Sequence, residues 1–334
     1  MQRGPDGFFR LEKDREALDE FLKEVRSESV RFPDLKQKLA FLIENGYYEN
    51  FFERYPEDEV LDVFRMTRVY PFQYPSYMSA FKFYTDYALR TNDRKRILEH
   101  YPDRVAAVAL HLANGDAALA RRLALSMMER RVQPATPTFL NAGRRRRGEL
   151  VSCFLLQMDD TLNSINYVLG TCMQLSKIGG GVAVNVSRLR GRGEPIRGVE
   201  GAAKGVVPVL KLLEDAFSYA DQMGQRKGAG AAYYNIFGWD VVEFLDTKKI
   251  NADEKSRLKT LAIGLIVPDK FYQLARDNRP LYVFAPYSVY QAYGVHLDDM
   301  DMDEMYERLL ADDRVKKKAV MGARDMLVKI ATIQ

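Results

Sequence analysis

The sequence feature that most constrains the fold is a change of pattern near residue 133. Before it, apolar residues recur at helical spacing, and after it, apolar runs of strand length alternate with helical segments. Helices are expected over residues 35–45, 77–89, 104–113 and 116–131, with Asp34 and Asp116 as candidate N-caps. We therefore expect a helical N-terminal domain over residues 1–132.

Residues 133–334 follow the alternation that is typical of an α/β domain with parallel strands. Strands are expected at residues 151–158, 182–186, 261–267 and 281–285, and helices at residues 162–177, 205–220 and 269–277. The segment QPATPTFLNAG, residues 133–143, has two prolines and a terminal glycine and is expected to be an extended loop. Residues 303–334 are expected to be largely helical, and the absence of Pro and Gly over residues 323–333 suggests a chain cut inside an element.

Composition excludes several classes of protein. With 334 residues and 47% hydrophobic content, the chain has material for about two folded domains. It has no run of roughly 18 uncharged apolar residues and its first residues are charged, so we expect a cytoplasmic protein without a membrane span or signal peptide. Its two cysteines and three scattered histidines predict neither a disulfide framework nor a metal site.

Positive charge and glycine are concentrated in one part of the chain. Residues 136–236 contain 13 basic and 8 acidic side chains, and 14 of the 22 glycines lie between Gly143 and Gly230. This combination suits an anionic ligand, because glycine lets peptide N–H groups approach phosphate closely. On composition alone, a loop-rich surface with solvated arginines is the simpler interpretation.

No single glycine motif identifies the ligand. GGGVAVNV (residues 179–186) lacks the helix start of a dinucleotide-binding fingerprint, and GQRKGAGA (residues 224–231) lacks the spacing of a P-loop. RGRGEPIRG (residues 190–198) places Arg190 and Arg197 on a loop fixed by Pro195, and arginine forks match phosphate oxygens. These features fit a nucleotide polyphosphate better than a nucleic acid, which more often requires aromatic side chains along a longer basic stripe.

The remaining candidates have plain structural interpretations. The four arginines at residues 144–147 are expected to form a solvated surface turn. Cys153, in a predicted strand directly after Ser152, and Cys172, in a predicted helix, are each expected from residue type alone to be small buried hydrophobes.

The order of the segments is more specific than any one of them. Four segments follow one another over residues 133–255: QPATPTFLNAG, GELVSCFLLQMDDTLNSI, QLSKIGGGVAVNVSRLRGRGEPIRG and GVVPVLKLLEDAFSYADQMGQRKGAGAAYYNIFGWDVVEFLDTKKINADEK. In this order they resemble the large catalytic subunit of class I ribonucleotide reductase, most closely its class Ib branch. The resemblance implies a helical N-terminal domain followed by the first part of a ten-stranded α/β barrel over residues 133–334. The lack of a preceding ATP-cone-like segment is likewise expected of class Ib.

The resemblance assigns roles position by position. Cys153 matches one of two redox-active cysteines that reduce the ribose 2′ position and form a disulfide. This match outweighs the interpretation of Cys153 as a small buried hydrophobe. The positions that bind the substrate diphosphate and ribose are matched by Thr136, Ser152, Gly180 and Gly181. The specificity-effector site is matched by Asp160, Thr161, Leu162 and Ile165 around the base and ribose, and by Arg190 and Arg197 at the triphosphate. Residues 223–229 match the loop that relays effector identity to the substrate base, through Gln225, Arg226 and Lys227.

The activity implied by the resemblance is reduction of ribonucleoside diphosphates to deoxyribonucleoside diphosphates for DNA precursor synthesis, by thiyl-radical chemistry. The implied effector is a deoxynucleoside triphosphate or ATP, and the implied reductant is a dithiol such as a glutaredoxin- or thioredoxin-like protein. Implied partners are a second copy of the large subunit and a small subunit whose dinuclear Mn or Fe site generates the radical. No metal is expected in this chain, and neither a membrane nor a nucleic acid is expected as a direct partner.

The resemblance also implies that part of the catalytic machinery lies beyond this sequence, in the C-terminal half of the large subunit. The family places its radical cysteine, the adjacent Asn and Glu, the second redox cysteine, the relay tyrosines and the C-terminal cysteines there, and this sequence ends at LVKIATIQ. Cys172 is a poor substitute because its helix is expected to serve dimer contacts. We therefore expect that this chain alone cannot reduce ribonucleotides. The alternative is a non-catalytic deoxynucleotide-binding module for regulation or assembly, which would have no complementing second half.

Overall fold

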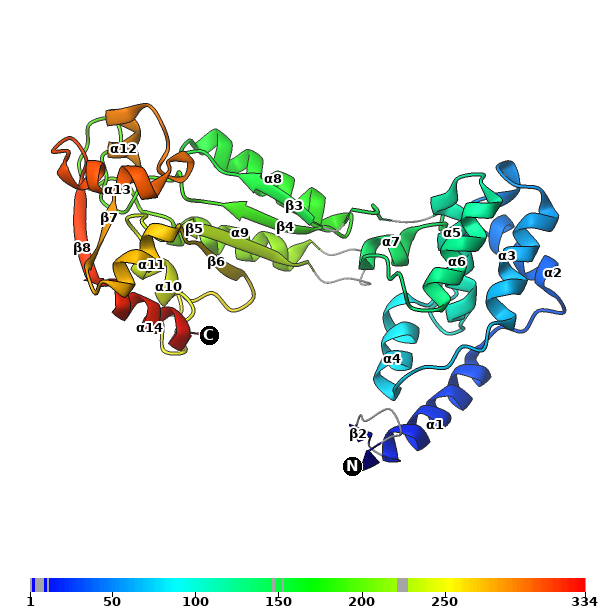
Figure 1. Cartoon of the computed structure of the whole chain (residues 1–334). Coiled ribbons are helices and arrows are strands. Elements are labelled where there is room, and N and C mark those ends of the chain that lie inside the picture. Colours follow the sequence, from blue (N-terminus) through cyan, green and yellow to red (C-terminus); the bar gives the residue numbers. More distant parts are fainter. Residues whose placement is uncertain are drawn as a thin grey trace. The chain divides into compact units, whose positions relative to one another are not determined.

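The computed structural model divides the chain into two compact units, residues 1–152 and residues 153–334. It describes residues 2–3, 9–10, 12–145, 148–151, 153–220 and 228–333 (Figure 1). Each unit has its own hydrophobic core.

The first unit is almost entirely helical where it is described. Its helices are α1 (Glu12–Glu28), α2 (Leu35–Glu44), η1 (Phe51–Glu53), α3 (Glu57–Val69), α4 (Tyr77–Lys82), η2 (Phe83–Tyr87), α5 (Tyr101–Ala113), α6 (Ala117–Met128) and α7 (Thr136–Asn141). Two short strands, β1 (Gln2–Arg3) and β2 (Phe9–Arg10), pair antiparallel. Asp34 accepts a hydrogen bond from the backbone N of Gln37 at 2.8 Å, and Asp116 from that of Leu119 at 2.9 Å. Both predicted N-caps are therefore confirmed.

A charged network is buried in this helical unit. The Glu99 carboxylate accepts from the Tyr48 hydroxyl at 2.6 Å and pairs with Arg104 at 3.1 Å and Arg144 at 2.6 Å. Burial alone would raise the pKa of Glu99, but the two guanidinium groups outweigh it and the pKa is lowered. The expectation of a solvated turn is thus wrong for Arg144, whose side chain is 4% exposed, because a buried carboxylate compensates its charge. Arg145 is exposed as expected.

The predicted extended loop at residues 133–143 is also wrong, because α7 occupies most of it. Pro137 lies in the first turn of α7, where no intrahelical N–H bond is needed, so the proline does not prevent the helix. Phe139 and Leu140 of α7 are buried. The compact units accordingly divide after residue 152, whereas the change of sequence pattern lies near residue 133.

The second unit is built on a parallel sheet. Its elements are β3 (Cys153–Gln157), α8 (Leu162–Lys177), β4 (Gly181–Asn185), α9 (Val207–Tyr219), β5 (Gly230–Asn235), α10 (Val241–Asp246), β6 (Ala262–Ile266), α11 (Asp269–Arg276), β7 (Pro280–Phe284), α12 (Pro286–Tyr293), η3 (Leu297–Asp299), α13 (Met302–Ala311), β8 (Lys317–Gly322) and α14 (Ala323–Ile333). The four strands β3 to β6 pair in sequence order, all parallel, with Cys153 opposite Gly181 and Val182 opposite Gly230 (Figure 1). The predicted α/β fold with parallel strands is confirmed.

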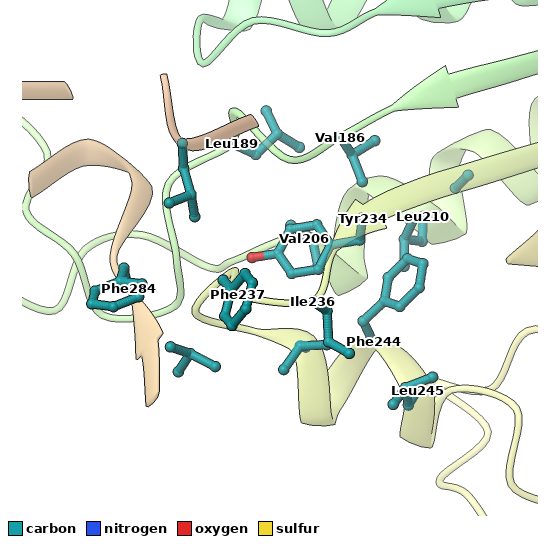
Figure 2. Packing of buried hydrophobic residues seen from close by; sticks show 14 of the residues in the cluster. Val186, Leu189, Val206, Leu210, Tyr234, Ile236, Phe237, Phe244, Leu245 and Phe284 are labelled. Atoms are coloured by element: carbon teal, nitrogen blue, oxygen red, sulfur yellow. The ribbon is translucent and has the colours of Figure 1, made fainter. Parts of the chain in front are cut away.

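The core of this unit fixes the long loop between β4 and α9. Figure 2 shows Val186, Leu189 and Val206 packed among apolar side chains from β5, α9 and α10, including Tyr234 and Phe244. Val186 and Leu189 lie at the start of the loop and Val206 at its end, and all three are buried. Burial of both ends holds the residues between them close to the carboxyl edge of the sheet.

One strand lies within residues that the sequence predicts to be helical. β8 pairs antiparallel with β7, and the ladder joins Leu281 to Met321 and Phe284 to Lys317. The six residues of β8 form their backbone hydrogen bonds with β7. This pairing makes them a strand, although the local sequence favours a helix. α13 and α14, on either side of β8, are helical as predicted. No helix among the described residues is long and apolar enough to span a bilayer.

Candidate functional site

The predicted effector residues begin at the turn that joins β3 to α8. Thr161 is the N-cap of α8 and accepts from the backbone N of Ser164 at 3.1 Å. The Ser164 hydroxyl in turn accepts from the backbone N of Asp159 at 3.0 Å. These reciprocal bonds hold the turn at residues 159–161 against the N-terminus of the helix, an end that favours negative charge.

Asp160 and Arg190, which the resemblance assigns to different parts of one effector, form an ion pair. The Arg190 Nε lies 2.6 Å from Asp160 Oδ2, and the Arg190 backbone N donates to Asp160 Oδ1 at 3.1 Å. The guanidinium also donates to the Pro195 carbonyl and lies 4.3 Å from the centre of the Tyr287 ring. Arg190 is thus oriented by a carboxylate, a carbonyl and an aromatic face.

The other predicted effector residues are exposed or half-buried. Leu162 is 80% exposed at the first position of α8, Thr161 is exposed and Ile165 is half-buried. Arg197 lies farther along the loop that follows Arg190, is exposed, and has a left-handed backbone with φ +50°. An exposed apolar side chain and a partly exposed arginine at the start of a long helix form an environment suited to a base and an anionic tail.

A buried carboxylate fixes the middle of the loop. Glu194 is 2% exposed and accepts from the backbone N of Gly191 at 2.6 Å and of Ser288, in α12, at 3.2 Å. Burial raises its pKa in spite of these hydrogen bonds. The loop is therefore tied to the N-terminal end of α12.

A second buried carboxylate fixes the end of the loop. Asp240 accepts from the backbone N of Arg192 at 3.0 Å and of Val206 at 3.1 Å, and burial raises its pKa. Gly205 has φ +75°, and a Cβ there would lie 2.4 Å from the Asp240 carboxylate. Asp160, Glu194 and Asp240 together set the path of the loop. Sequence reasoning missed the last two, since their backbone partners are not visible in any motif.

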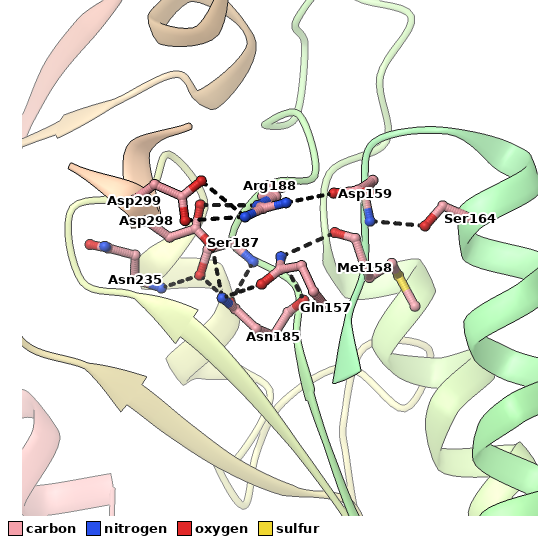
Figure 3. Close-up of polar contacts among 10 residues, drawn as sticks. All are labelled: Gln157, Met158, Asp159, Ser164, Asn185, Ser187, Arg188, Asn235, Asp298 and Asp299. Atoms are coloured by element: carbon pink, nitrogen blue, oxygen red, sulfur yellow. Dashed lines mark hydrogen bonds and ion pairs between the residues drawn. The ribbon is translucent and has the colours of Figure 1, made fainter. Parts of the chain in front are cut away.

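A polar layer lies across the carboxyl ends of β3, β4 and β5 (Figure 3). The Asn185 amide donates to Gln157 Oε1 at 2.9 Å and to Asp298 Oδ2 at 2.8 Å. Arg188, three residues on, donates to Asp159 Oδ1 at 2.9 Å and to Asp299 Oδ2 at 2.9 Å. Sequence reasoning counted Arg188 only as part of a basic region, because two of its carboxylate partners, Asp298 and Asp299, are more than a hundred residues away in η3.

The two cysteines differ sharply in their surroundings. Cys153 is the first residue of β3 and is exposed, so the buried-hydrophobe interpretation fails for it. Cys172 is fully buried in α8, as expected, and burial raises the pKa of its thiol to about 12. Since the thiolate is the reactive form, Cys172 is inert at neutral pH.

The glycines beside Cys153 allow close packing. A Cβ at Gly180 would lie 2.3 Å from the Phe154 ring, and Gly181 pairs in register with Cys153. Cys153 and Asp160 lie at opposite ends of β3, so the structure does not bring the predicted redox thiol and the effector residues together within this unit.

The remaining predicted residues are placed elsewhere. Thr136 belongs to the helical unit, where its hydroxyl lies 3.1 Å from that of Tyr87. Ser152, Gln225, Arg226 and Lys227 lie outside the described residues.

Within the part of the chain that is described, no group of three or more His, Cys, Asp or Glu side chains could hold a metal ion.

Comparisons with known proteins identify the family of the chain. Three family models match consecutive parts of the chain: ribonucleotide reductase N-terminal over residues 1–72, ribonucleotide reductase all-alpha domain over residues 73–147, and ribonucleotide reductase barrel domain over residues 151–334. The ribonucleoside-diphosphate reductase subunit alpha of Bacillus subtilis (strain 168) is 53% identical over 331 residues, covering 98% of this chain and 47% of the relative. The protein of the same name from Mycoplasma pneumoniae is 45% identical over 98% of this chain and 45% of the relative, and that from Treponema pallidum is 28% identical over 88% and 36%.

The chain thus spans about half the length, or less, of these curated relatives. The match to the barrel-domain model alone covers more than half of the chain. The chain belongs to the ribonucleotide reductase family and corresponds to the N-terminal portion of its large subunit.

Proposed function

We propose that this chain provides the specificity-effector site and one wall of the substrate site of a class Ib ribonucleoside-diphosphate reductase. Residues 1–132 would form its helical domain and residues 133–334 the first half of its catalytic barrel. The observation that carries the proposal is the Asp160–Arg190 pair at the N-terminus of α8, in a chain that belongs to this family.

The effector in this proposal is a deoxynucleoside triphosphate or ATP. Arg190 and the exposed Arg197 bind the triphosphate, and Asp160, Thr161, Leu162 and Ile165 contact the base and ribose. Three features support this assignment: Arg190 is held in place before ligand arrives, Leu162 offers exposed apolar surface, and the helix N-terminus favours an anion.

The substrate wall is proposed for the opposite end of β3. Cys153 supplies one of the two thiols that reduce the ribose, and Thr136, Ser152, Gly180 and Gly181 bind the nucleoside diphosphate. The exposure of Cys153 supports this role, because a redox thiol must be accessible. Gln225, Arg226 and Lys227 relay effector identity to the substrate base.

The overall reaction replaces the ribose 2′-hydroxyl by hydrogen and releases water, while two thiols become a disulfide. A thiyl radical removes and then returns the 3′ hydrogen. Cys153 is one of the two reducing thiols, and the second thiol and the radical cysteine come from the rest of the large subunit, since Cys172 is buried with a raised pKa. A glutaredoxin- or thioredoxin-like dithiol restores the thiols, and a small subunit with dinuclear Mn or Fe generates the radical. The assembly, with a second large subunit, is cytoplasmic.

A second candidate is a non-catalytic deoxynucleotide-binding module for regulation or assembly. It is favoured by the separation of the predicted effector residues from the exposed thiol, because the Asp160–Arg190 pair and Cys153 lie at opposite ends of β3.

Two measurements test these functions. Titration calorimetry with dTTP, dATP, dGTP and ATP should detect binding of at least one of them to the chain, and absence of all binding would contradict both candidates. Deoxynucleotide formation is then assayed with the small subunit and a dithiol, with and without a polypeptide carrying the remaining half of an α subunit. If deoxynucleotides form only when that polypeptide is present, the chain is a catalytic half. If the chain binds effector but no such polypeptide gives activity, the chain is a regulator.

A further inference from the structure

The side chains around Arg188 connect three segments that are far apart in sequence. Arg188 follows β4, Asp159 follows β3, and Asp298 and Asp299 belong to η3 (Figure 3). Arg188 Nη1 lies 2.9 Å from Asp159, Nη2 lies 2.9 Å from Asp299, and Nε lies 3.5 Å from Asp298. One guanidinium therefore holds the β3–α8 turn to η3.

The backbone of Arg188 is itself firmly placed. It lies between Val186 and Leu189, both buried in the core, and the Leu189 backbone N donates to the Val186 carbonyl at 3.2 Å. On the other side, Asp298 is 4% exposed and accepts from Asn185 at 2.8 Å. Of the three carboxylates, Asp159 lies on the turn that carries the effector residues, so this contact fixes the turn to a rigid support.

Asp159 and Asp160 are neighbours that pair with different arginines. Asp160 holds Arg190, and Asp159 holds Arg188. A triphosphate that binds Arg190 competes with Asp160 for the same guanidinium, which weakens the first attachment of the turn. The second attachment, through Asp159, does not involve Arg190 and persists.

We propose that Arg188 is a positioning residue of the effector site, and that its ion pairs with Asp159, Asp298 and Asp299 keep Asp160 and the start of α8 in place while a nucleoside triphosphate occupies Arg190. The inference rests on the proposed effector site and adds to it a residue with no role in ligand contact.

Two alternatives are less consistent with the geometry. A solvated surface pair would contribute little. Asp159 and Asp299 are about half exposed, but the Arg188 side chain that joins them is 21% exposed and the Asp298 side chain beside it is 4% exposed. A direct phosphate ligand would need a free cationic edge, whereas Arg188 faces three carboxylates whose combined negative charge repels phosphate.

Hydrogen exchange on the nucleotide-free chain tests the positioning directly. The backbone N–H groups of Asp159, Thr161 and Ser164 are hydrogen-bonded within the turn and report its opening. Arg188→Gln should speed their exchange about tenfold or more, because a charge-assisted attachment is lost, and Arg188→Lys should restore part of the protection. Arg279→Gln is the matched control. It removes the same charge from an ion pair with Glu307 in the same unit and should change exchange at the turn less than about threefold.

Asp159→Asn gives a second route to the same result. Its carboxylate is 55% exposed, so the substitution removes the attachment while Asp298 and Asp299 remain paired with Arg188. Faster exchange confined to the turn in Arg188→Gln or Asp159→Asn supports the proposal. Unchanged exchange at these three amides in folded variants overturns it.

A double-mutant cycle with dTTP separates positioning from direct contact. Arg188→Gln should weaken dTTP binding about tenfold in the wild-type background and less than about threefold in the Asp160→Asn background, since both substitutions act through Asp160. Equal losses in the two backgrounds would make Arg188 an independent ligand and overturn the inference. If the wild-type chain binds no deoxynucleoside triphosphate, the proposed function fails, and the exchange experiment still decides the role of Arg188.

Discussion

At the scale of single residues, the proposed effector site depends on how Arg190 is held before any ligand binds. A guanidinium free in solution loses side-chain entropy when it binds a phosphate, whereas Arg190 is already oriented by the Pro195 carbonyl and the Tyr287 ring, two uncharged contacts that remain when a phosphate competes with Asp160. Its side chain remains 20% exposed, which leaves part of the guanidinium accessible to an anion. Preorganisation of this kind increases affinity without adding a contact.

Arg190→Ala should therefore weaken deoxynucleoside triphosphate binding by about 1.5–3 kcal/mol, the scale of a charge-assisted hydrogen bond. Titration calorimetry with dTTP measures the change. Arg192→Ala removes the same charge from an exposed side chain two positions along the loop and should have little effect. Equal affinity of Arg190→Ala and the wild-type chain would remove Arg190 from the site.

The glycine beside the exposed thiol makes a separate prediction. Gly180→Ala would place a methyl group 2.3 Å from the Phe154 ring, so we expect the free energy of unfolding to fall by about 1–3 kcal/mol. Gly170→Ala, in α8, has no atom within 4 Å of the new methyl and should raise it by about 0.5–1 kcal/mol. Urea unfolding of both variants gives the comparison. A Gly180→Ala protein as stable as the wild type would mean that Phe154 moves aside without cost.

At the scale of elements, one carboxylate joins a helix to the strand that completes the described sheet. Glu214 of α9 accepts from the backbone N of Lys259 and of Thr260, each at 2.6 Å, immediately before β6. Lys211 donates to its other oxygen at 2.7 Å. Burial would raise the pKa of Glu214, but these donors outweigh it and lower the pKa from 4.5 to about 2.

The sign of the pH dependence follows from that shift. A carboxyl group whose pKa is lowered by folding stabilises the native state above its unfolded pKa of 4.5 and loses that contribution as the pH falls toward 2. Glu214→Gln should cost about 1–3 kcal/mol at neutral pH and little near pH 2. Glu254→Gln, which alters an exposed ion pair with Lys259, should leave the acid-unfolding midpoint unchanged. A stability difference for Glu214→Gln that does not depend on pH would contradict this account.

The elements that the sequence predicts well are those with local signals. The bounds of α8 agree with the predicted residues 162–177, because Thr161 caps the helix and its apolar positions are periodic. The sequence does not predict β8 or α7. β8 depends on pairing with β7, which lies more than thirty residues earlier in the chain, and α7 is a short helix that has a proline in its first turn and is stabilised by burial of its side chains. The same limit applies to the site. The resemblance names Asp160 and Arg190 as separate effector contacts, and their ion pair is seen only in the structure. Glu194 and Arg188 likewise have partners about a hundred residues away that no local pattern indicates.

At the scale of the whole molecule, the two units have separate cores and therefore separate sources of stability. The core of the helical unit encloses the Glu99 network, and that of the α/β unit supports the loop between β4 and α9. The single tryptophan of the sequence, Trp239, lies in the α/β unit, where its indole N–H donates to the Arg192 carbonyl at 3.1 Å. Tryptophan fluorescence thus reports on the α/β unit alone, while far-UV circular dichroism reports on helices in both.

Glu99→Gln should separate these two signals. The substitution keeps the shape of the side chain but leaves Arg104 and Arg144 buried without a compensating charge, which should destabilise the helical unit by about 3–5 kcal/mol. We expect part of the dichroism to be lost at lower denaturant, while the Trp239 transition and dTTP affinity stay as in the wild type. Glu57→Gln, in an exposed pair with Lys36, is the control and should shift neither signal. A common shift of both transitions would show that the units unfold as one, and the stability of the effector site would then depend on the helical core as well as on its own.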